Sequence, residues 1–406
     1  MVATAPLQVL LFRRTDDKDL TPVADAIVSA FQGSTDPKGY LAAGAGVSVT
    51  PELFEEAPIF PVGTKLDAAC HTLVIVLVGR AFHRALHNAD DATLRNWLSN
   101  CWAHVDQSAD RHRMLVFPVE ESMARDFSGL SGLDSLQIWP LHKFDEYALQ
   151  STMVALLALH EAHRLLALSL ERRSSDGQSY GRLRFFISHA KIDALPLARA
   201  LKDLIHRIPW LRSFYDADDL LPGMNWKREL EQGVASSLII VLRTDIYDTR
   251  YWCQQEITWA DQYGTPAVLV DARTALNNES SALPFTRLPI ARVPDGNLMR
   301  ILSIALREGV KYLLFKRRAE EMKLNGPLPR NVALRVFSYP PSMRALLHAC
   351  RSLQSANLPE ATQKVILYPD PPLPEGEREA ALALLDRHAP KTTMLVTPQT
   401  LIANFG

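Results

Sequence analysis

The sequence has few of the features that assign a chain to a specialised environment. Its four cysteines lie far apart without a Cys-x-x-Cys pair, which provides neither a zinc site nor a disulfide framework and suits a reducing compartment. Lysine plus arginine (44) nearly balance aspartate plus glutamate (45), so no overall charge favours nucleic acid. Apolar runs such as Leu73–Val78 are far shorter than the ~20 residues that span a bilayer, and no basic segment precedes an apolar run at the N-terminus. We therefore expect a cytoplasmic protein without nucleic-acid or membrane partners.

Several motifs of cofactor and metal chemistry are also missing. No Gly-x-x-x-x-Gly-Lys-Ser/Thr occurs, and Gly44-Ala45-Gly46 is too short for a dinucleotide fingerprint. His160 and His163 lack the i, i+4 spacing of a His-Glu-x-x-His zinc site. His83 and His87 have that spacing, but no third ligand obviously joins them. We expect no metal and no bound cofactor.

What the chain does contain is a regular alternation of short apolar runs and helical patterns, which indicates an α/β fold with parallel sheets flanked by helices. The expected strands are Val9–Phe12, Leu73–Val78, Met114–Phe117, Leu183–Ile187, Arg212–Tyr215, Leu238–Leu242, Ala267–Val270, Pro289–Val293, Leu334–Phe337, Val365–Tyr368 and Met394–Val396. The expected helices include Thr21–Phe31, with Thr21 as N-cap and Pro22 at the first helical position, Tyr147–Arg172, Ala194–Ile208, Trp226–Ser236, Arg250–Gln262, Asn297–Arg307 and Lys311–Lys323.

The length of 406 residues predicts two or three domains. A long Leu/Ala-rich helical stretch and the Ser174-Ser175-Asp176-Gly177 linker separate an N-terminal part from a middle part. Asn325-Gly326-Pro327 marks a later boundary. The predicted division is an N-terminal α/β domain, a helical connector and linker, a middle α/β domain, a helical linker and a small C-terminal α/β domain, at residues 1–145, 146–180, 181–310, 311–330 and 331–406.

The middle part carries the most specific pattern. It opens with Phe185-Phe186-Ile187-Ser188-His189, continues through Phe214-Tyr215-Asp216 to Leu221-Pro222-Gly223, and reaches Trp252-Cys253-Gln254-Gln255-Glu256 after a buried strand. Over residues 182–310 this succession resembles a TIR (Toll/interleukin-1 receptor) domain. The last element is similar to the Trp-x-x-x-Glu of bacterial TIR domains that cleave NAD+. The resemblance implies a flavodoxin-like sheet in this part of the chain.

The resemblance also implies roles for individual residues. Glu256 corresponds to the catalytic glutamate and Trp252 to its companion. The substrate-binding residues that it implies are Trp252, Ser188, Asp216, Trp226, Phe186 and Lys191. Some active members carry arginines where this chain has His189-Ala190-Lys191, and a lysine offers a phosphate a point charge rather than a bidentate fork.

The residues themselves give a chemical reason for this assignment. On a helix, Trp252, Glu256 and Trp259 lie at i, i+4 and i+7 and share one face. Breaking the nicotinamide–ribose bond builds positive charge on the sugar, which a neighbouring carboxylate stabilises. Nicotinamide leaves as a neutral molecule, so one carboxylate suffices. The plain alternative is a glutamate on the helix surface beside two core tryptophans.

By resemblance the chain is an NAD+ nucleosidase, an immune effector that depletes NAD+ during phage infection and is activated by self-association through TIR–TIR contacts. An unidentified nucleotide or protein activator is implied as a partner. Two alternatives remain open. The enzyme could cyclise ADP-ribose into a signal, because both reactions pass through the same cation. The domain could also be a scaffold without enzymatic activity.

The three α/β segments align loosely with one another. Pro222-Gly223 through Leu242 matches Pro61-Val62-Gly63 through Val78, so that Trp252 and Glu256 fall opposite Trp97 and Cys101. The C-terminal segment echoes the same order of loop, helix and strand. The chain could therefore be three tandem TIR-like units, or unrelated βαβ units that align by chance. A Cys101 nucleophile would need His104 as its base, and we do not expect this chemistry.

Overall fold

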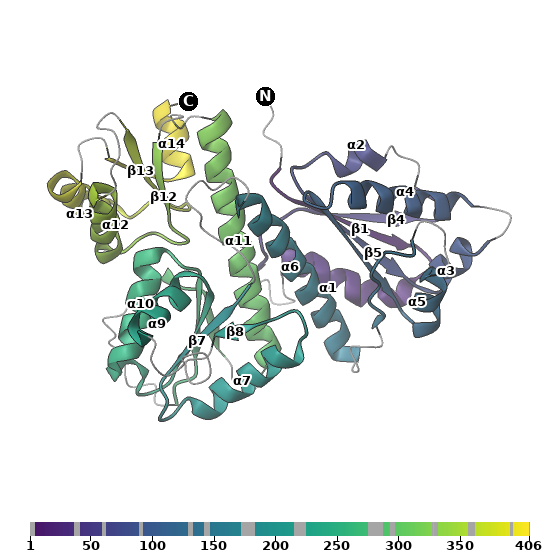
Figure 1. The fold of residues 1–406 in the computed structure, drawn as a ribbon, viewed down its shortest axis with the longest axis horizontal. Helices are drawn as coiled ribbons and strands as arrows, with labels where there is room; N and C mark the ends of the chain where they lie inside the picture. The colour runs from purple at the N-terminus through teal and green to yellow at the C-terminus, as the bar shows by residue number, and fades with distance from the viewer. Residues whose placement is uncertain are drawn as a thin grey trace. The chain divides into compact units, whose positions relative to one another are not determined.

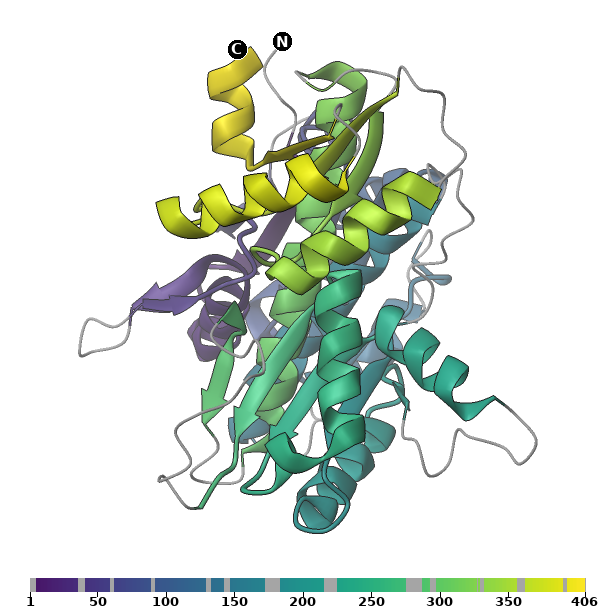
Figure 2. The same ribbon diagram turned by 90° about the vertical axis from the view of Figure 1, so that its left-hand side faces the viewer.

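The computed structural model describes the chain in fourteen stretches: residues 5–35, 41–58, 62–88, 92–128, 133–141, 147–171, 183–214, 225–274, 287–292, 297–326, 328, 332–355, 362–389 and 393–405. The chain divides into two compact units, residues 1–181 and 182–406, and each is described separately below. Figure 1 and Figure 2 show the elements of both units, coloured along the chain.

The first unit is built around a parallel sheet in the order β4-β1-β5-β6. Its elements are β1 (Gln8–Arg14), η1 (Lys18–Leu20), α1 (Thr21–Gln32), β2 (Gly33–Thr35), β3 (Leu41–Ala43), β4 (Val49–Phe54), α2 (Val62–Leu66), β5 (Thr72–Val78), α3 (Arg80–Leu86), α4 (Thr93–Gln107), β6 (His112–Pro118), α5 (Glu121–Ser128) and α6 (Tyr147–Glu171). A separate pair, β2 and β3, is antiparallel. Every residue of β5 is buried, as expected for a central strand covered on both faces.

Helix α6 belongs to this unit, where it packs against α1 and contacts β5 and β6. Among the described residues, Gln150–Glu171 is the one stretch long and apolar enough to cross a membrane. However, 83% of its most apolar 18-residue segment is buried inside the protein. Its apolar composition is therefore that of a core helix.

The described residues of the second unit form two sheets. A five-stranded parallel sheet has the order β11-β10-β9-β7-β8, and a three-stranded parallel sheet has the order β12-β13-β14. The elements are β7 (Phe185–His189), α7 (Leu195–Arg207), β8 (Ser213–Phe214), α9 (Trp226–Ala235), β9 (Leu238–Arg243), η3 (Tyr247–Thr249), α10 (Tyr251–Tyr263), β10 (Ala267–Asp271), β11 (Ile290–Arg292), α11 (Leu298–Asn325), β12 (Val332–Val336), α12 (Met343–Ser355), β13 (Gln363–Leu367), α13 (Glu375–His388), β14 (Thr393–Val396) and α14 (Pro398–Phe405).

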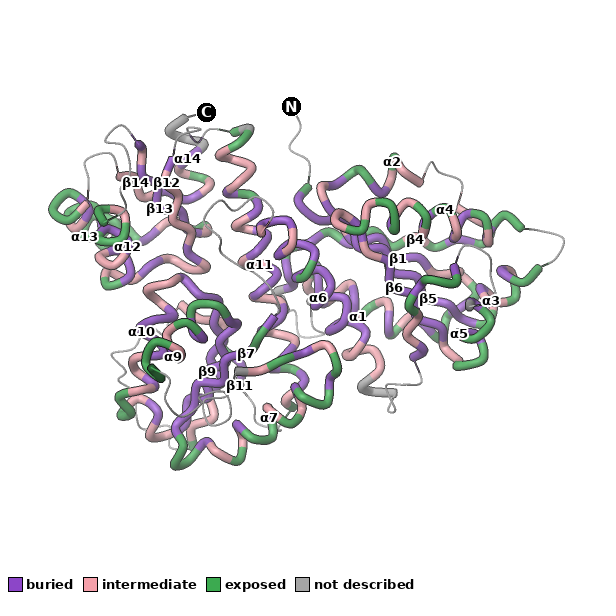
Figure 3. The backbone as a smooth tube through the Cα atoms, in the orientation of Figure 1, coloured by how far each residue is buried: buried purple, intermediate pink, exposed green. Residues whose placement is uncertain are grey.

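The inner strands β7 and β9 of the larger sheet are buried throughout, as Figure 3 shows. Side chains of α9 and α10 form one core cluster with alternate residues of β9, Ile239 and Val241. The intervening Ile240 and Leu242 point to the other face, because side chains alternate along a strand. They are also fully buried, and α11 contacts β9 and β10.

Helix α11 is a single helix of 28 residues. Two helices are expected here from the sequence, Asn297–Arg307 and Lys311–Lys323. Gly309 lies between them, and a glycine inside a helix costs about 1 kcal/mol relative to alanine. The helix continues through Gly309, whose neighbours Leu306 and Val310 are fully buried. Tertiary packing thus outweighs the local preference.

The sheets of the two units share part of their topology. In chain order, the strands of the larger sheet of the second unit lie in the order 2-1-3-4-5, and the four strands of the first unit lie in the order 2-1-3-4. An isolated parallel bridge between Val116 and Ile138 adds to the outer strand β6 of the first unit. The small C-terminal sheet has the order 1-2-3, which differs from both.

In each unit, an aspartate that follows the first strand of the sheet accepts hydrogen bonds from the segment after the third strand. Asp17 accepts backbone hydrogen bonds from Ala81 (2.8 Å) and Phe82 (3.1 Å) at the start of α3. Asp193 accepts from the Thr244 hydroxyl (2.8 Å) and the Ile246 backbone (3.3 Å). Each carboxylate therefore ties the loop after the first strand to the segment that follows the third.

The predicted fold class, α/β with parallel sheets flanked by helices, is confirmed. Thr21 is the first residue of α1 and not its N-cap, because η1 leads directly into the helix and gives Leu20 a helical conformation. Strand β4 is absent from the sequence expectations. It lies at the sheet edge and contains Pro51, and its middle residues are largely exposed, so it lacks the apolar pattern of a buried strand.

Candidate active site

Helix α10 places the Trp-x-x-x-Glu element beside the end of strand β7. The helix follows the extended residue Arg250 and ends at Gly264, which has the left-handed conformation (φ 66°) of many helix C-termini. A Cβ at Gly264 would meet Phe337 at 2.9 Å, so a side chain there is excluded by contact as well as by conformation. The buried Ile257 and Ala260 set which side of the helix faces the sheet.

Glu256 is buried, with 8% of its surface exposed. Its Oε2 atom accepts a hydrogen bond from the Ser188 hydroxyl at 2.5 Å. Ser188 is itself 1% exposed and lies in β7, beside Val241 of β9. The carboxylate and the serine are 68 residues apart in sequence, and the predicted pair of functional residues is thus brought into direct contact.

Tyr247 extends this contact into a chain of hydrogen bonds. Its hydroxyl lies 2.5 Å from Ser188 Oγ. Burial first, and then the nearby Cys253 and Glu256, raise the pKa of the Tyr247 phenol well above its usual value, so it stays protonated. The Ser188 hydroxyl has one hydrogen, which it donates in the hydrogen bond to Glu256, so it accepts the hydrogen bond from Tyr247. The resulting order is Tyr247 to Ser188 to Glu256.

Three aromatic rings lie next to this chain. Trp252, one turn before Glu256, is half-buried and packs against the core cluster. The Trp226 ring meets it at 4.1 Å between centroids, and Tyr251 at 4.9 Å, both edge-on. Trp226 is 44% exposed and Tyr251 59% exposed. Trp259 is 5% exposed and belongs to the core, so the helix face changes from open to buried along its length.

The loop between β9 and α10 is held by several polar contacts. Arg243 and Asp248 form a paired ion contact, with Nε to Oδ1 at 3.1 Å, and Gln254 donates to the Asp248 carbonyl at 2.6 Å. Together with the hydrogen bonds of Asp193 described above, these contacts hold the loop at both of its ends. This loop carries Tyr247, so its position relative to Ser188 is fixed from several sides.

The remaining predicted site residues are placed differently. Phe186 is 2% exposed and packs in the core cluster with α9 and α10. Lys191 is exposed just beyond the end of β7. Asp216 and the Leu221-Pro222-Gly223 loop lie outside the described residues.

Tyr247, Asp193 and Asp248 are site residues that sequence reasoning missed. Each lies in a loop outside the Trp-x-x-x-Glu element, and their contacts depend on how the loops meet at the end of the sheet. The position of Thr244–Tyr247 directly after a buried strand could have pointed to Tyr247, because ligands of open α/β sheets gather beyond the carboxyl ends of strands.

The equivalent place in the first unit is apolar. Cys101 is 1% exposed and burial raises the pKa of its thiol to about 12, so it has almost no thiolate form at neutral pH. His104 does not act on it but faces Asp67, with Nε2 at 3.4 Å from Oδ2. The arrangement agrees with the expectation that Cys101 is not a nucleophile.

Comparisons with known proteins identify the middle part of the chain. The family model described as "TIR domain" matches residues 185–284. No curated protein gives a significant match to the chain. Tagatose-6-phosphate ketose/aldose isomerase from Escherichia coli is a similar solved structure, at 10% identity over 78% of this chain and 84% of that one. Its TM-score of 0.20 is too low to indicate a shared fold.

Proposed function

Residues 185–284 contain a TIR domain, and from this premise we propose that the protein cleaves the nicotinamide–ribose bond of NAD+. Glu256 is the catalytic residue of the proposal. Its carboxylate stabilises the positive charge that develops on the ribose as nicotinamide leaves, and water then completes a hydrolysis.

The observation that carries the proposal is the hydrogen bond from Ser188 to Glu256 at the end of β7. A catalytic carboxylate needs a fixed orientation, because a misplacement of about 1 Å can cost about 100-fold in rate. Ser188 and Tyr247 supply that orientation from the sheet and the loop. The half-exposed indole pair of Trp252 and Trp226 offers an aromatic surface next to the carboxylate, suited to a nicotinamide or adenine ring.

A scaffold function is favoured by a different observation. Glu256 is largely withdrawn from solvent, so its carboxylate could act as an anchor between α10 and β7 and nothing more. Trp226 and Tyr251 would then serve as an exposed contact surface for another TIR domain. The two functions predict different effects of removing the charge at Glu256: an enzyme loses nicotinamide release, whereas a scaffold has no such activity to lose.

The test is nicotinamide release from NAD+ by concentrated full-length protein, beside the Glu256→Gln variant. We expect the variant to lose activity by at least about 100-fold, as for the loss of a main electrostatic contact. Glu308→Gln is the matched control, since Glu308 pairs with Lys311 on α11, away from this site, and its loss should leave the rate unchanged. Equal rates for Glu256→Gln and wild type would reject Glu256 as the catalytic group.

The other outcomes assign the alternatives. If wild type releases no nicotinamide at concentrations at which it self-associates, the scaffold is supported. If release occurs, chromatography of the co-product separates ADP-ribose, the product of hydrolysis, from a cyclic ADP-ribose.

A further inference from the structure

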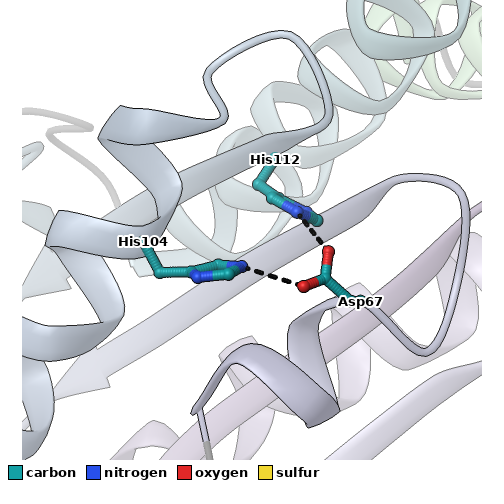
Figure 4. Close-up of side chains that lie close together, drawn as sticks. All are labelled: Asp67, His104 and His112. Atoms are coloured by element: carbon teal, nitrogen blue, oxygen red, sulfur yellow. Dashed lines mark hydrogen bonds and ion pairs between the residues drawn. The ribbon is translucent and has the colours of Figure 1, made fainter.

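A second group of side chains with chemistry of its own lies in the first unit, outside the candidate active site. Asp67 directly follows α2, His104 lies in the last turn of α4, and His112 begins β6. Figure 4 shows the two imidazole rings converging on the two oxygens of the Asp67 carboxylate. Three separate elements thus deliver two nitrogens and a carboxylate to one place.

The spacing of the atoms matches a coordination shell. His112 Nε2 is 3.3 Å from Asp67 Oδ1, and His104 Nε2 is 3.4 Å from Asp67 Oδ2. All three potential ligand atoms lie within 4.8 Å of one another. Bonds of about 2.0–2.1 Å from Zn²⁺ in a tetrahedral arrangement place neighbouring ligand atoms about 3.3 Å apart. The His112 contact is a long hydrogen bond, which a metal ion would replace. Both separations exceed the usual ~2.9 Å of an N–H···O hydrogen bond.

The burial of the histidines is the second observation. The His112 side chain is fully buried, and the His104 side chain is 27% exposed. His104 Nε2, the atom that faces Asp67, is buried and makes no hydrogen bond. A buried polar atom without a hydrogen bond costs about 1–3 kcal/mol, and a bound cation would satisfy it.

We propose that Asp67, His104 and His112 bind a divalent transition-metal ion, with Zn²⁺ as the best chemical match. Two imidazoles and a carboxylate are ligands that Zn²⁺ commonly takes. Three protein ligands leave a fourth position for water, and the Asp67 side chain, 39% exposed, gives that position access to solvent. The ion would tie α2, α4 and β6 together.

Arg111 is the charge that opposes a cation here. Its Nη1 is 3.0 Å from Asp67 Oδ1. A carboxylate has about four lone-pair sites, so the same oxygen can accept from arginine while it faces a metal. Carboxylate ligands are generally held by such outer donors. Arg111 therefore orients Asp67 and at the same time weakens the binding of a cation.

A second group, His83, His87 and Asp126, provides a matched control in the same unit. Its ligand atoms are equally close, but His83 Nε2 already bonds to Asp126 Oδ2 at 3.0 Å and two of the three residues are exposed. Water competes at such a surface site, so any binding should be weak.

The test is Co²⁺ titration of chelator-treated full-length protein, followed by the visible absorption of the bound ion, with Zn²⁺ competition and metal analysis after gel filtration. We expect about one ion per chain. His104→Ala and the shape-conserving Asp67→Asn should each lower Co²⁺ affinity at least about 100-fold. Arg111→Gln should raise it several-fold, and the His83→Ala, His87→Ala double variant should retain it within about 2-fold.

Two results would overturn the proposal. One is a wild type that keeps no Co²⁺ or Zn²⁺ after gel filtration. The other is metal retained by Asp67→Asn at unchanged affinity, whether or not the His83→Ala, His87→Ala variant also retains it. Circular dichroism of each variant shows whether it is folded, and Asp67→Asn decides the matter if His104→Ala is not. A rise in melting temperature with Zn²⁺, present in wild type and absent in Asp67→Asn, is an independent readout.

Discussion

The first sheet and the larger sheet of the second unit share the order of their first four strands and differ in the side chains at two matching positions. In the register of the second unit, Ser188 of β7 lies beside Val241 of β9 and bonds to Glu256. In the first unit, Phe12 of β1 lies beside Val76 of β5, and its ring packs on Trp97 at 4.9 Å. A phenyl ring occupies the position of the serine hydroxyl.

The same exchange occurs on the helix after the third strand. Trp97 and Cys101 of α4 have the spacing of Trp252 and Glu256 of α10, but all of Cys101 and nearly all of Trp97 are buried. The hydroxyl and carboxylate of one sheet are thus replaced by a ring and a thiol in the other. The same arrangement of strands and helix thus carries a polar site in one unit and an apolar core in the other. The side chains at two positions, one on the first strand and one on the helix, account for the difference.

The largest expected effect concerns the tryptophans. Trp97→Ala should destabilise the first unit by about 3–5 kcal/mol, because the ring is buried between Phe12 and Phe54. Trp252→Ala should cost only about 1–2 kcal/mol, since its ring is half-buried, but should reduce nicotinamide release. Urea unfolding followed by circular dichroism measures both. Equal losses of stability would contradict the distinction between sealed and open faces.

Next in size is the loss of the serine hydroxyl. A hydrogen bond to a charged group contributes about 1.5–3 kcal/mol, so Ser188→Ala should lower kcat by about 10- to 100-fold. Phe12→Leu, at the matching register position of the first unit, should leave kcat unchanged. A Ser188→Ala variant that loses stability at full kcat would instead favour the anchoring role of Glu256.

The stability of the first unit should depend on pH through a buried histidine. Burial lowers the pKa of His163 on α6 from 6.5 to about 3. Below pH 6.5 the unfolded chain binds a proton that the folded chain does not, so stability falls as pH falls, by about 1.4 kcal/mol per unit. At pH 5.5 the wild type should therefore lose about 1.3 kcal/mol more than His163→Leu, relative to pH 7. Parallel curves for the two proteins would refute this.

The smallest effect is expected from Tyr247→Phe, which removes one hydroxyl and keeps the ring. The loss of the bond to Ser188 should cost about 1 kcal/mol, or about 5-fold in kcat. The KM for NAD+ should stay the same, because Tyr247 is fully buried and does not face solvent. A change in KM alone would contradict its role as a residue that positions Glu256.

The sequence predicted the buried strands well, because runs such as Leu238–Leu242 are apolar on both faces. It also predicted the helix that carries Trp252 and Glu256. It did not predict Tyr247, because its link to Ser188 joins residues 59 positions apart and arises only when the loop after β9 folds over the end of β7. The Asp67, His104 and His112 group was missed for the same reason, as its members come from three elements with no common spacing.

Local preference failed where tertiary packing prevailed. Strand β4 has Thr50, Pro51 and Glu52 at its exposed edge and reads as a loop, yet it pairs in register with β1 over six residues. In α11 the two expected helices are one, and buried neighbours on both sides compensate for Gly309. In both places the deciding interactions come from parts of the chain that are distant in sequence.

Helix α11 has a consequence for how this protein can be divided. The helix contacts β9 and β10 of the larger sheet, and in its second half Ala319 belongs to the core of the C-terminal sheet, with Phe315 and Met322 packed against it. At 1.5 Å per residue it is a rod of about 42 Å common to two hydrophobic cores. A cut after α11 would leave Phe315, Ala319 and Met322 without the strands that cover them, and a cut at residue 310 would divide the helix between the two fragments. A gene fusion or deletion that separates the C-terminal sheet from the TIR domain must therefore also change the buried side chains of α11.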